Sequence, residues 1–353
     1  AGGCTIDSLK LMKKLLILML AVAAASCVEK PEAGSPEPPI DVDIDHFQTA
    51  ETFDVPVKAG SVTIVKADGV TIAEADSPLT IWVPRMNRTR AEEGVSVEYV
   101  PVDEYPGFTG NKAQMFQVIC FEDSYEGDYD YNDLVIHVLY QQKGNIFGFG
   151  VQPIALGSAK SIQLGCTVYK GAAKVFDGLI TPEGKDCREQ YFKSVEGFIN
   201  VNNRNEIDFT EPNYLASTCR NWDLSKIAGT GAPRVEWFIE AGGKRIYALS
   251  TTYLNQSFDK SGLPLGLVIT TTGTVYTENG YECGFDWFNY PHESVHIRSV
   301  YPQMWEWLSS DKAYSFSEFY DGYNPPKNAY RACDNGLFKV PTTDVTLVRF
   351  RQN

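Results

Sequence analysis

Hydrophobic and polar residues alternate with a period of two in a series of short segments after residue 53. This alternation predicts strands with one buried face, and the glycines, prolines and Asp-Gly pairs between the segments predict turns. The predicted strands are Val55–Val57, Ser61–Lys66, Val70–Ala73, Leu79–Val83, Val95–Val100, Gln114–Phe121, Leu134–Tyr140, Phe147–Val151, Ser161–Tyr169, Arg234–Ile239 and Arg245–Ser250. Val275–Thr277 and Tyr281–Cys283 flank Asn279-Gly280 and predict a hairpin, because Asn-Gly tolerates the positive φ angles of a type I′ turn.

A helical period replaces this alternation between Pro291 and Ser310. The apolar residues that recur there at helical spacing are Ile297, Val300, Tyr301, Met304, Trp305 and Leu308. One stripe of this kind predicts an amphipathic helix that docks on a sheet. Pro302 lacks a backbone donor, so we expect it to kink the helix or to begin its second half.

These elements predict a mainly β protein, with a β-sandwich or jelly-roll-like fold and one amphipathic helix near the C-terminus. We expect a small N-terminal β region over residues 46–110 and a larger β domain over residues 111–353. No repeat of fixed period is visible, which excludes solenoids and propellers.

The first residues predict export and lipidation. Residues 12–26 contain two lysines and then an apolar run that is too short to span a bilayer, which is typical of a signal peptide. Cys27 directly follows Ala24-Ala25-Ser26, an arrangement that resembles a bacterial lipobox, and the resemblance implies cleavage before Cys27 and its acylation. We expect residues 1–11 to be upstream read-through, and an ordinary secretory signal remains the alternative.

The next segment, residues 27–45, is rich in proline and acidic residues and predicts an extended, solvated tether. The acidic residues close behind Cys27 resemble the surface-export signals of Bacteroidetes lipoproteins. The expected location is therefore the bacterial outer membrane, with the lipid anchor at Cys27 as the membrane contact and the protein exposed at the cell surface.

Composition narrows the classes of partner. The chain of 353 residues carries a net charge of −14, which argues against nucleic acid as a partner because the phosphate backbone would repel it. Six cysteines lie beyond residue 27, at Cys120, Cys166, Cys187, Cys219, Cys283 and Cys333. None forms a C-x-x-C pair, so zinc ribbons and thioredoxin-like sites are excluded. We expect at most two disulfides, with Cys120 as a small buried hydrophobic residue.

The strongest chemical signal is an acidic segment between two predicted strands, residues 122–133, with six carboxylates. Carboxylate, amide and carbonyl oxygens are the ligands of Ca²⁺, and a bound ion would offset the repulsion among these charges. The candidate calcium ligands are Glu122, Asp123, Asp128, Asp130, Asn132 and Asp133. The segment is not an EF-hand, because position 12 counted from Asp128 is Leu139. A solvated acidic turn without an ion remains the alternative.

The same residues carry a family resemblance. Phe121-Glu122-Asp123 and the run from Gly127 to Ile136 resemble the signature of the LruC domain, a β-rich domain of bacterial surface lipoproteins. The similarity resumes at Gly262–Gly266 and again from His292 onward, so it covers residues 114–320, with a poor match over residues 185–237. The resemblance implies a place at the cell surface and no particular reaction.

Two other functions stay open. His292-Glu293-Ser294-Val295-His296 spells the H-E-x-x-H motif of zinc hydrolases, in which both histidines bind zinc from one helix face. The pattern does not single out a third zinc ligand, since no later histidine follows and the later carboxylates, Glu306 and Glu318 among them, are scattered. The aromatic stretches Phe285–Tyr290 and Tyr320–Pro326 could instead stack on sugars or on a partner protein, so the surface ligand is expected to be a glycan or a protein, or they could belong to the core. The sequence thus favours a non-catalytic, calcium-stabilised binding or adhesion lipoprotein, with a zinc hydrolase or a carbohydrate-binding lipoprotein as alternatives.

Overall fold

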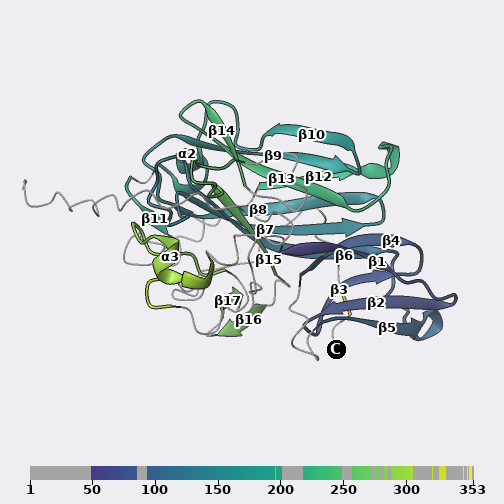
Figure 1. The fold of residues 1–353 in the computed structure, drawn as a ribbon. Coiled ribbons are helices and arrows are strands. Elements are labelled where there is room, and N and C mark those ends of the chain that lie inside the picture. Colours follow the sequence, from purple (N-terminus) through teal and green to yellow (C-terminus); the bar gives the residue numbers. More distant parts are fainter. Residues whose placement is uncertain are drawn as a thin grey trace, which may run out of the picture. The chain divides into compact units, whose positions relative to one another are not determined.

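A computed structural model describes the chain over residues 49–85, 94–194, 196–200, 218–248, 257–271, 275–278, 281–284, 288–304, 320, 326–330, 345, 348 and 350–351. The predicted signal peptide, Cys27 and the tether lie outside the described residues. The described part is mainly β, as predicted (Figure 1).

Seventeen strands are described. They are β1 (Ala50–Val55), β2 (Ser61–Ala67), β3 (Val70–Ala75), β4 (Leu79–Pro84), β5 (Val95–Pro101), β6 (Lys112–Phe121), β7 (Leu134–Lys143), β8 (Ile146–Leu156), β9 (Ile162–Lys170), β10 (Ala173–Leu179), β11 (Ile199–Asn200), β12 (Thr218–Asp223), β13 (Pro233–Ala241), β14 (Lys244–Tyr247), β15 (Gly266–Thr271), β16 (Val275–Glu278) and β17 (Tyr281–Gly284). The helices are short: α2 (Cys187–Phe192), α3 (Ile297–Val300), and the 3₁₀ turns η1 (Val102–Glu104) and η3 (Leu224–Lys226).

The largest sheet has nine strands among the described residues, all of them antiparallel to their neighbours. Its order is β11-β8-β7-β6-β3-β2-β5; β12 also pairs with β8, and β15 also pairs with β6. The central strands β6, β7 and β8 are buried along most of their length, so both faces of the sheet are covered there.

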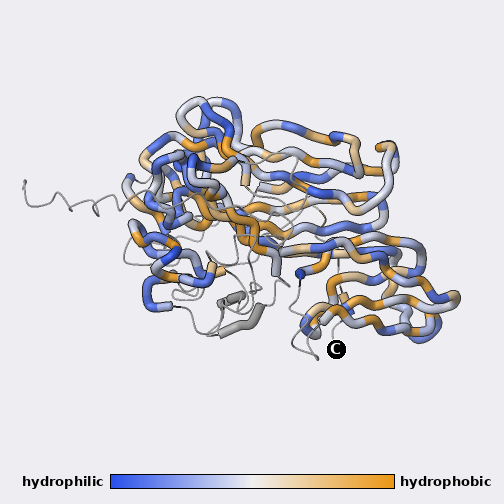
Figure 2. Tube along the Cα trace, viewed as in Figure 1, coloured by the Kyte–Doolittle hydropathy of each residue, from blue (hydrophilic) through white to orange (hydrophobic). Residues whose placement is uncertain are grey.

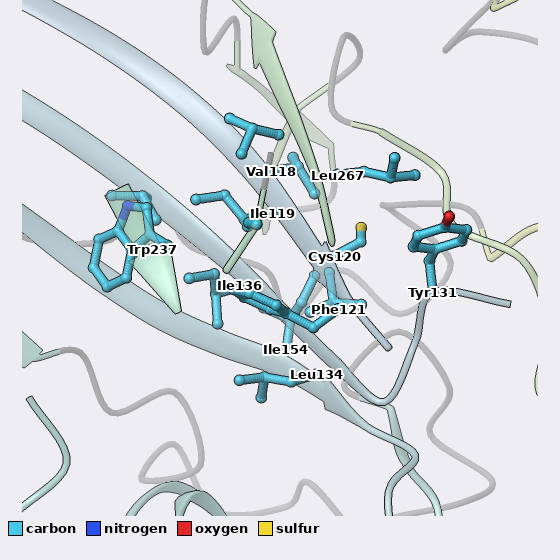
Figure 3. Packing of buried hydrophobic residues seen from close by; sticks show 14 of the residues in the cluster. Val118, Ile119, Cys120, Phe121, Tyr131, Leu134, Ile136, Ile154, Trp237 and Leu267 are labelled. Atoms are coloured by element: carbon cyan, nitrogen blue, oxygen red, sulfur yellow. The ribbon is translucent and has the colours of Figure 1, made fainter. Parts of the chain in front are cut away.

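A second sheet, with the order β10-β9-β13-β14, packs on this one and makes the β-sandwich. Trp237 of β13 is 1% exposed and lies 4.9 Å from Phe149 of β8, measured between ring centroids. Its indole N–H donates to the hydroxyl of Tyr140 in β7 at 2.6 Å. Figure 3 shows Trp237 at one end of the buried cluster and Tyr131 at the other. The core therefore extends from the second sheet to the end of the β6–β7 hairpin.

The predicted N-terminal region shares the large sheet, because β3 pairs with β6 at Ala73 and Glu74. It also keeps a hydrophobic cluster of its own, which includes Val65, Ile72 and Ile81. Hydrophobic and hydrophilic residues follow one another closely along these strands (Figure 2). Strands of the predicted N-terminal region, residues 46–110, therefore belong to the same sheet as strands of residues 111–353, although the sequence pattern predicted two regions.

The C-terminal helix is shorter than predicted. α3 begins at Ile297, so the prediction of helix is wrong for residues 291–296. The helix ends at Val300, and residues 302–304 are helical again, as expected for a proline that begins a second half. Ile297, Val300, Tyr301 and Met304 are all buried, which confirms this part of the stripe. Trp305 and Leu308 lie outside the described residues.

The hairpin prediction is confirmed by the pairing of β16 with β17. Cys120 is fully buried, as expected, and Cys120, Cys166 and Cys187 are free thiols. Cys333 lies outside the described residues. Within the described residues, helices long and apolar enough to cross a bilayer are absent.

Candidate metal centre

The acidic loop, residues 122–133, joins the paired ends of β6 and β7. Phe121 and Leu134 lie opposite one another in the strand register and are fully buried. The backbone N–H of Glu122 donates to the carbonyl of Leu265 at 2.9 Å, and that of Gly157 donates to the carbonyl of Asn132 at 3.0 Å. The sheet and its neighbours therefore fix both ends of the loop.

Three of the six carboxylates converge. One oxygen each from Glu122, Asp128 and Asp130 lie within 4.8 Å of one another, and this is the only such group of three or more acidic, His or Cys residues in the part of the chain that the structure describes. Glu122 and Asp130 are buried, whereas Asp128 is exposed. The group thus has a buried side and a side open to water.

Glu122 is the residue that makes this group unusual. Its side chain is fully buried, and Oε1 accepts the backbone N–H of Tyr131 at 2.6 Å. Its other oxygen, Oε2, is buried without a hydrogen-bond partner. Gly127 packs against it, since a Cβ on that glycine would lie 2.1 Å from Oε2. A buried carboxylate oxygen with no donor is costly, so this atom needs a partner.

The pKa values of the cluster show how unfavourable its charge is. Burial, followed by the charges of Asp133 and Asp130, raises the pKa of Glu122 well above its usual range. Burial, then the charges of Asp128 and Glu293, raises the pKa of Asp130 to about 8. Burial, then the charge of Asp123, raises the pKa of Asp133 to about 7. All these neighbouring charges are carboxylates, so full ionisation of the cluster calls for a compensating cation.

The other predicted ligands have different surroundings. Asp123 Oδ1 lies 2.6 Å from Lys160 Nζ, and its Oδ2 accepts the hydroxyl of Ser158. Asp133 accepts the backbone N–H of Asp123 at 2.7 Å and so closes the loop. The backbone N–H of Asn132 donates to Asp130 Oδ1 at 3.2 Å. Asp123 thus has a cation of its own, while Asp130 is held in place by backbone donors.

The tyrosines of the loop separate the carboxylates. Tyr129 and Tyr131 both have positive φ angles, 54° and 55°. Tyr131 lies in the hydrophobic cluster and donates its hydroxyl to the carbonyl of Pro264 at 2.7 Å, while Tyr129 donates to Asp259 at 2.6 Å. These contacts draw the two rings away from the carboxylate group.

A distant segment also reaches this group, which the sequence analysis missed. The backbone N–H of Ser294 donates to Asp130 Oδ2 at 2.7 Å. The charge of Glu293 acts on the pKa values of both Asp130 and Asp133. The one sequence signal at this position was the H-E-x-x-H motif, which indicates zinc and gives no hint of the acidic loop.

The zinc motif does not have the geometry that its chemistry uses. His296 is the N-cap of α3, with Nδ1 accepting the N–H of Arg298 at 3.0 Å, so it does not share a helix face with His292. The His292 ring lies against Tyr330, 4.3 Å away between centroids. The two histidines and Glu293 are not among the described groups whose ligand atoms converge.

The aromatic stretches are in part core residues. Phe288 and Tyr290 are each 1% exposed, whereas residues 285–287 and 321–325 lie outside the described residues. A separate groove, open to solvent, lies beside β4, β6, β7 and β13. Trp82, Gln114, Gln142 and Arg234 are among its lining residues. Sugar binding stays a prediction.

Comparison with models of known families, with characterised proteins and with solved structures finds no match. The resemblance to the LruC domain therefore stays a prediction.

Proposed function

We propose that a Ca²⁺ ion bound by the acidic loop stabilises a β domain that serves in binding or adhesion at the bacterial cell surface. In this proposal the protein is a lipoprotein of LruC type, anchored in the outer membrane through Cys27. Residues 27–45 act as the tether that holds the domain away from the bilayer. The role of the metal is structural, and the protein needs no catalytic residues.

One observation carries the calcium proposal: the partnerless, buried Oε2 of Glu122 lies in a group with oxygens of Asp128 and Asp130. A cation there would supply the missing partner and would offset the repulsion among the three charges. The donors are all hard oxygens, which suit Ca²⁺, whereas zinc in proteins favours nitrogen and sulfur. Exposed Asp128 leaves room for water among the six to eight ligands that Ca²⁺ takes.

The ion would also explain why a polar group is tolerated next to the main core. Glu122 directly follows β6, whose last six residues are buried. Neutralising this carboxylate removes the desolvation cost at the end of the central hairpin. The expected consequence is a loop that keeps one conformation and a more stable sheet below it.

Calcium titration of metal-depleted protein tests the proposal. We expect heat of binding in calorimetry and a melting temperature roughly 5–10 °C higher in calcium than in chelator, since ligand well above its Kd adds about 3 kcal/mol. Glu122→Gln should abolish this difference. Glu126→Gln is the matched control, because that side chain belongs to the same loop and is 87% exposed.

Equal melting temperatures in calcium and chelator, together with no heat of binding, would contradict the proposal. Uptake of zinc in preference to calcium would contradict it as well, and metal analysis of the purified protein distinguishes the two ions.

A further inference from the structure

The groove beside β4, β6, β7 and β13 lies where three sheets meet. β4 belongs to the two-stranded sheet with β1, β6 and β7 belong to the large sheet, and β13 belongs to the second sheet. Met115 and Val235 pack against the main core and line the groove, and both are only partly buried. Ligand sites in proteins are concave and mostly apolar, with a few polar groups that set specificity. The groove is therefore a candidate binding site.

The groove carries little charge. Arg234 is the one charged residue among the described residues that line it, whereas the whole chain carries a net charge of −14. The chain already compensates this arginine, because its Nε lies 3.8 Å from Glu236 Oε1 and its guanidinium lies 4.2 Å from the centre of the Tyr169 ring. A strongly charged ligand would lose its water here without gaining an opposite charge. The lining thus favours a neutral ligand.

Glutamines supply most of the polar side chains of the groove, namely Gln114, Gln117, Gln141 and Gln142. Two of them are half-buried and held by the backbone. Gln114 Nε2 donates to the carbonyl of Thr71 at 3.2 Å, and Gln142 Nε2 donates to the carbonyl of Gly144 at 3.0 Å. A glutamine amide both donates and accepts hydrogen bonds, and so does a hydroxyl group. The polar part of the lining therefore suits a ligand rich in hydroxyls.

Trp82 adds an aromatic surface to the groove. The side chain is half-buried, and its indole N–H donates to the carbonyl of Pro233 at 2.9 Å, which fixes the position of the ring. An aromatic ring offers a flat apolar face at a small cost in conformational entropy. A sugar ring also has an apolar face, formed by its carbon-bound hydrogens, and its hydroxyls project at the edge. The indole and the amides together match both parts of such a ring.

The bond between Trp82 and Pro233 also argues against an extended peptide as the ligand. A peptide that adds a strand to a sheet needs free backbone donors and acceptors along the edge. Pro233 has no N–H, and its carbonyl already accepts the indole of Trp82. The start of β13 therefore offers neither group at this position.

We propose that the groove binds a neutral carbohydrate, with one face of a sugar ring against Trp82 and its hydroxyls hydrogen-bonded to the amides of Gln114 and Gln142. This inference rests on the binding role proposed above, and it adds a site and a class of ligand to that role. It is independent of the calcium ion, because the lining residues of the groove lie outside the acidic loop.

Binding of the intact protein to immobilised oligosaccharides tests the ligand class. The panel consists of neutral oligomers of glucose, mannose, galactose and xylose, with polygalacturonate as the anionic comparison. We expect at least one neutral oligomer to bind and polygalacturonate not to bind. Titration calorimetry with the oligomer that binds then gives its Kd.

Two variants test the site with that oligomer. Gln142→Ala should raise the Kd about tenfold, because a hydrogen bond to the ligand is lost. Trp82→Phe should raise the Kd and should also abolish the change in tryptophan fluorescence that accompanies binding. Gln303→Ala is the matched control, since this exposed glutamine does not line the groove and should keep both the Kd and the fluorescence change. Thermal melting verifies that each variant is folded.

The outcomes separate this inference from the calcium site. Failure of every neutral oligomer to bind refutes the inference and leaves the calcium site intact, because calcium titration measures that site by itself. A Kd that is unchanged in both Gln142→Ala and Trp82→Phe places the sugar elsewhere and refutes the inference, as does binding of polygalacturonate alone. Protein that takes up no calcium but binds the oligomer in the groove refutes the calcium site alone and supports the inference.

Discussion

Two fully buried glutamates, Glu74 and Glu122, differ in how the chain compensates their negative charge. Glu74 in β3 lies 3.1 Å from Lys112 Nζ in the paired strand β6. Its oxygens also accept the hydroxyl of Tyr105 at 2.7 Å and the backbone N–H of Arg351 at 2.8 Å. Glu122 has one backbone donor, one oxygen without a partner, and carboxylates as its charged neighbours.

The difference shows which charges the chain compensates by itself. A buried carboxylate survives where hydrogen bonds and an opposite charge replace the lost water. Glu74 obtains both from residues 105, 112 and 351 of the same chain. Glu122 obtains one hydrogen bond from the chain. In the proposed function, a bound cation supplies the opposite charge that stabilises this carboxylate. We therefore expect the first site to be independent of calcium and the second to depend on it.

Removing the cation of the self-contained site should have the largest effect. Lys112→Met leaves Glu74 buried and without its counter-charge, which we expect to lower the free energy of unfolding by about 3–5 kcal/mol. The loss should be equal in calcium and in chelator, as measured by urea denaturation. Lys174→Met is the control, because its ion pair with Asp177 is exposed and should cost less than about 1 kcal/mol. A loss that depends on calcium would erase the distinction between the sites.

The pH dependence of metal-depleted protein should show the second-largest effect. Asp130 and Asp133 hold their protons in the folded state until pH values of about 8 and 7, whereas unfolded aspartates release them near pH 4. The folded state thus binds more protons between these values, so its stability should fall as pH rises through this window. Urea denaturation of protein passed over chelating resin measures this.

Calcium should flatten this dependence, because it binds the deprotonated carboxylates. Asp130→Asn separates the contribution of the cluster to this pH dependence from that of other groups, such as Glu98. Burial raises the pKa of Glu98, but the neighbouring Lys66 and Arg351 lower it below its usual range. If the free energy of unfolding depends on pH equally in wild-type protein and in this variant, both in metal-depleted buffer, the cluster does not titrate as described.

The smallest effect should come from Gly127→Ala. The added Cβ would lie 2.1 Å from Glu122 Oε2, so the carboxylate has to move, at a cost of about 1–2 kcal/mol. Thermal melting in calcium measures this loss. Gly107→Ala is the matched control, since the nearest atom to its Cβ lies 3.7 Å away. Equal losses in the two variants would mean that Glu122 has no fixed position.

Local pattern was a good guide to strands with alternating exposure and to the acidic loop. It missed β15, whose six residues are all buried, because a strand covered on both faces shows no alternation. It also missed α2 and β10 to β12, which are short or half-exposed. The helical stripe predicted the burial of Ile297, Val300, Tyr301 and Met304 but the wrong first residue, since a hydrophobic period does not mark where a helix is capped.

The sequence predicted only part of the candidate site, because only some of its residues lie close together in the chain. Glu122, Asp128 and Asp130 lie within nine residues, so their clustering could be anticipated. The pairing of Asp123 with Lys160 and the approach of Glu293 involve residues far apart in the chain. They depend on which strands become neighbours, and the spacing of residues along the chain contains no such information.

The sequence by itself determined the β character, the buried cysteine at position 120 and the concentration of charge between β6 and β7, because these follow from side chains only a few residues apart. Only the tertiary structure decided that Lys112 neutralises Glu74, that Glu122 keeps an oxygen without a partner, and that residues 291–297 close over the loop. The physical reason is that strand register and the packing of distant segments determine which side chains are buried and which groups lie next to them. Those neighbours decide whether a buried charge is compensated from within the chain.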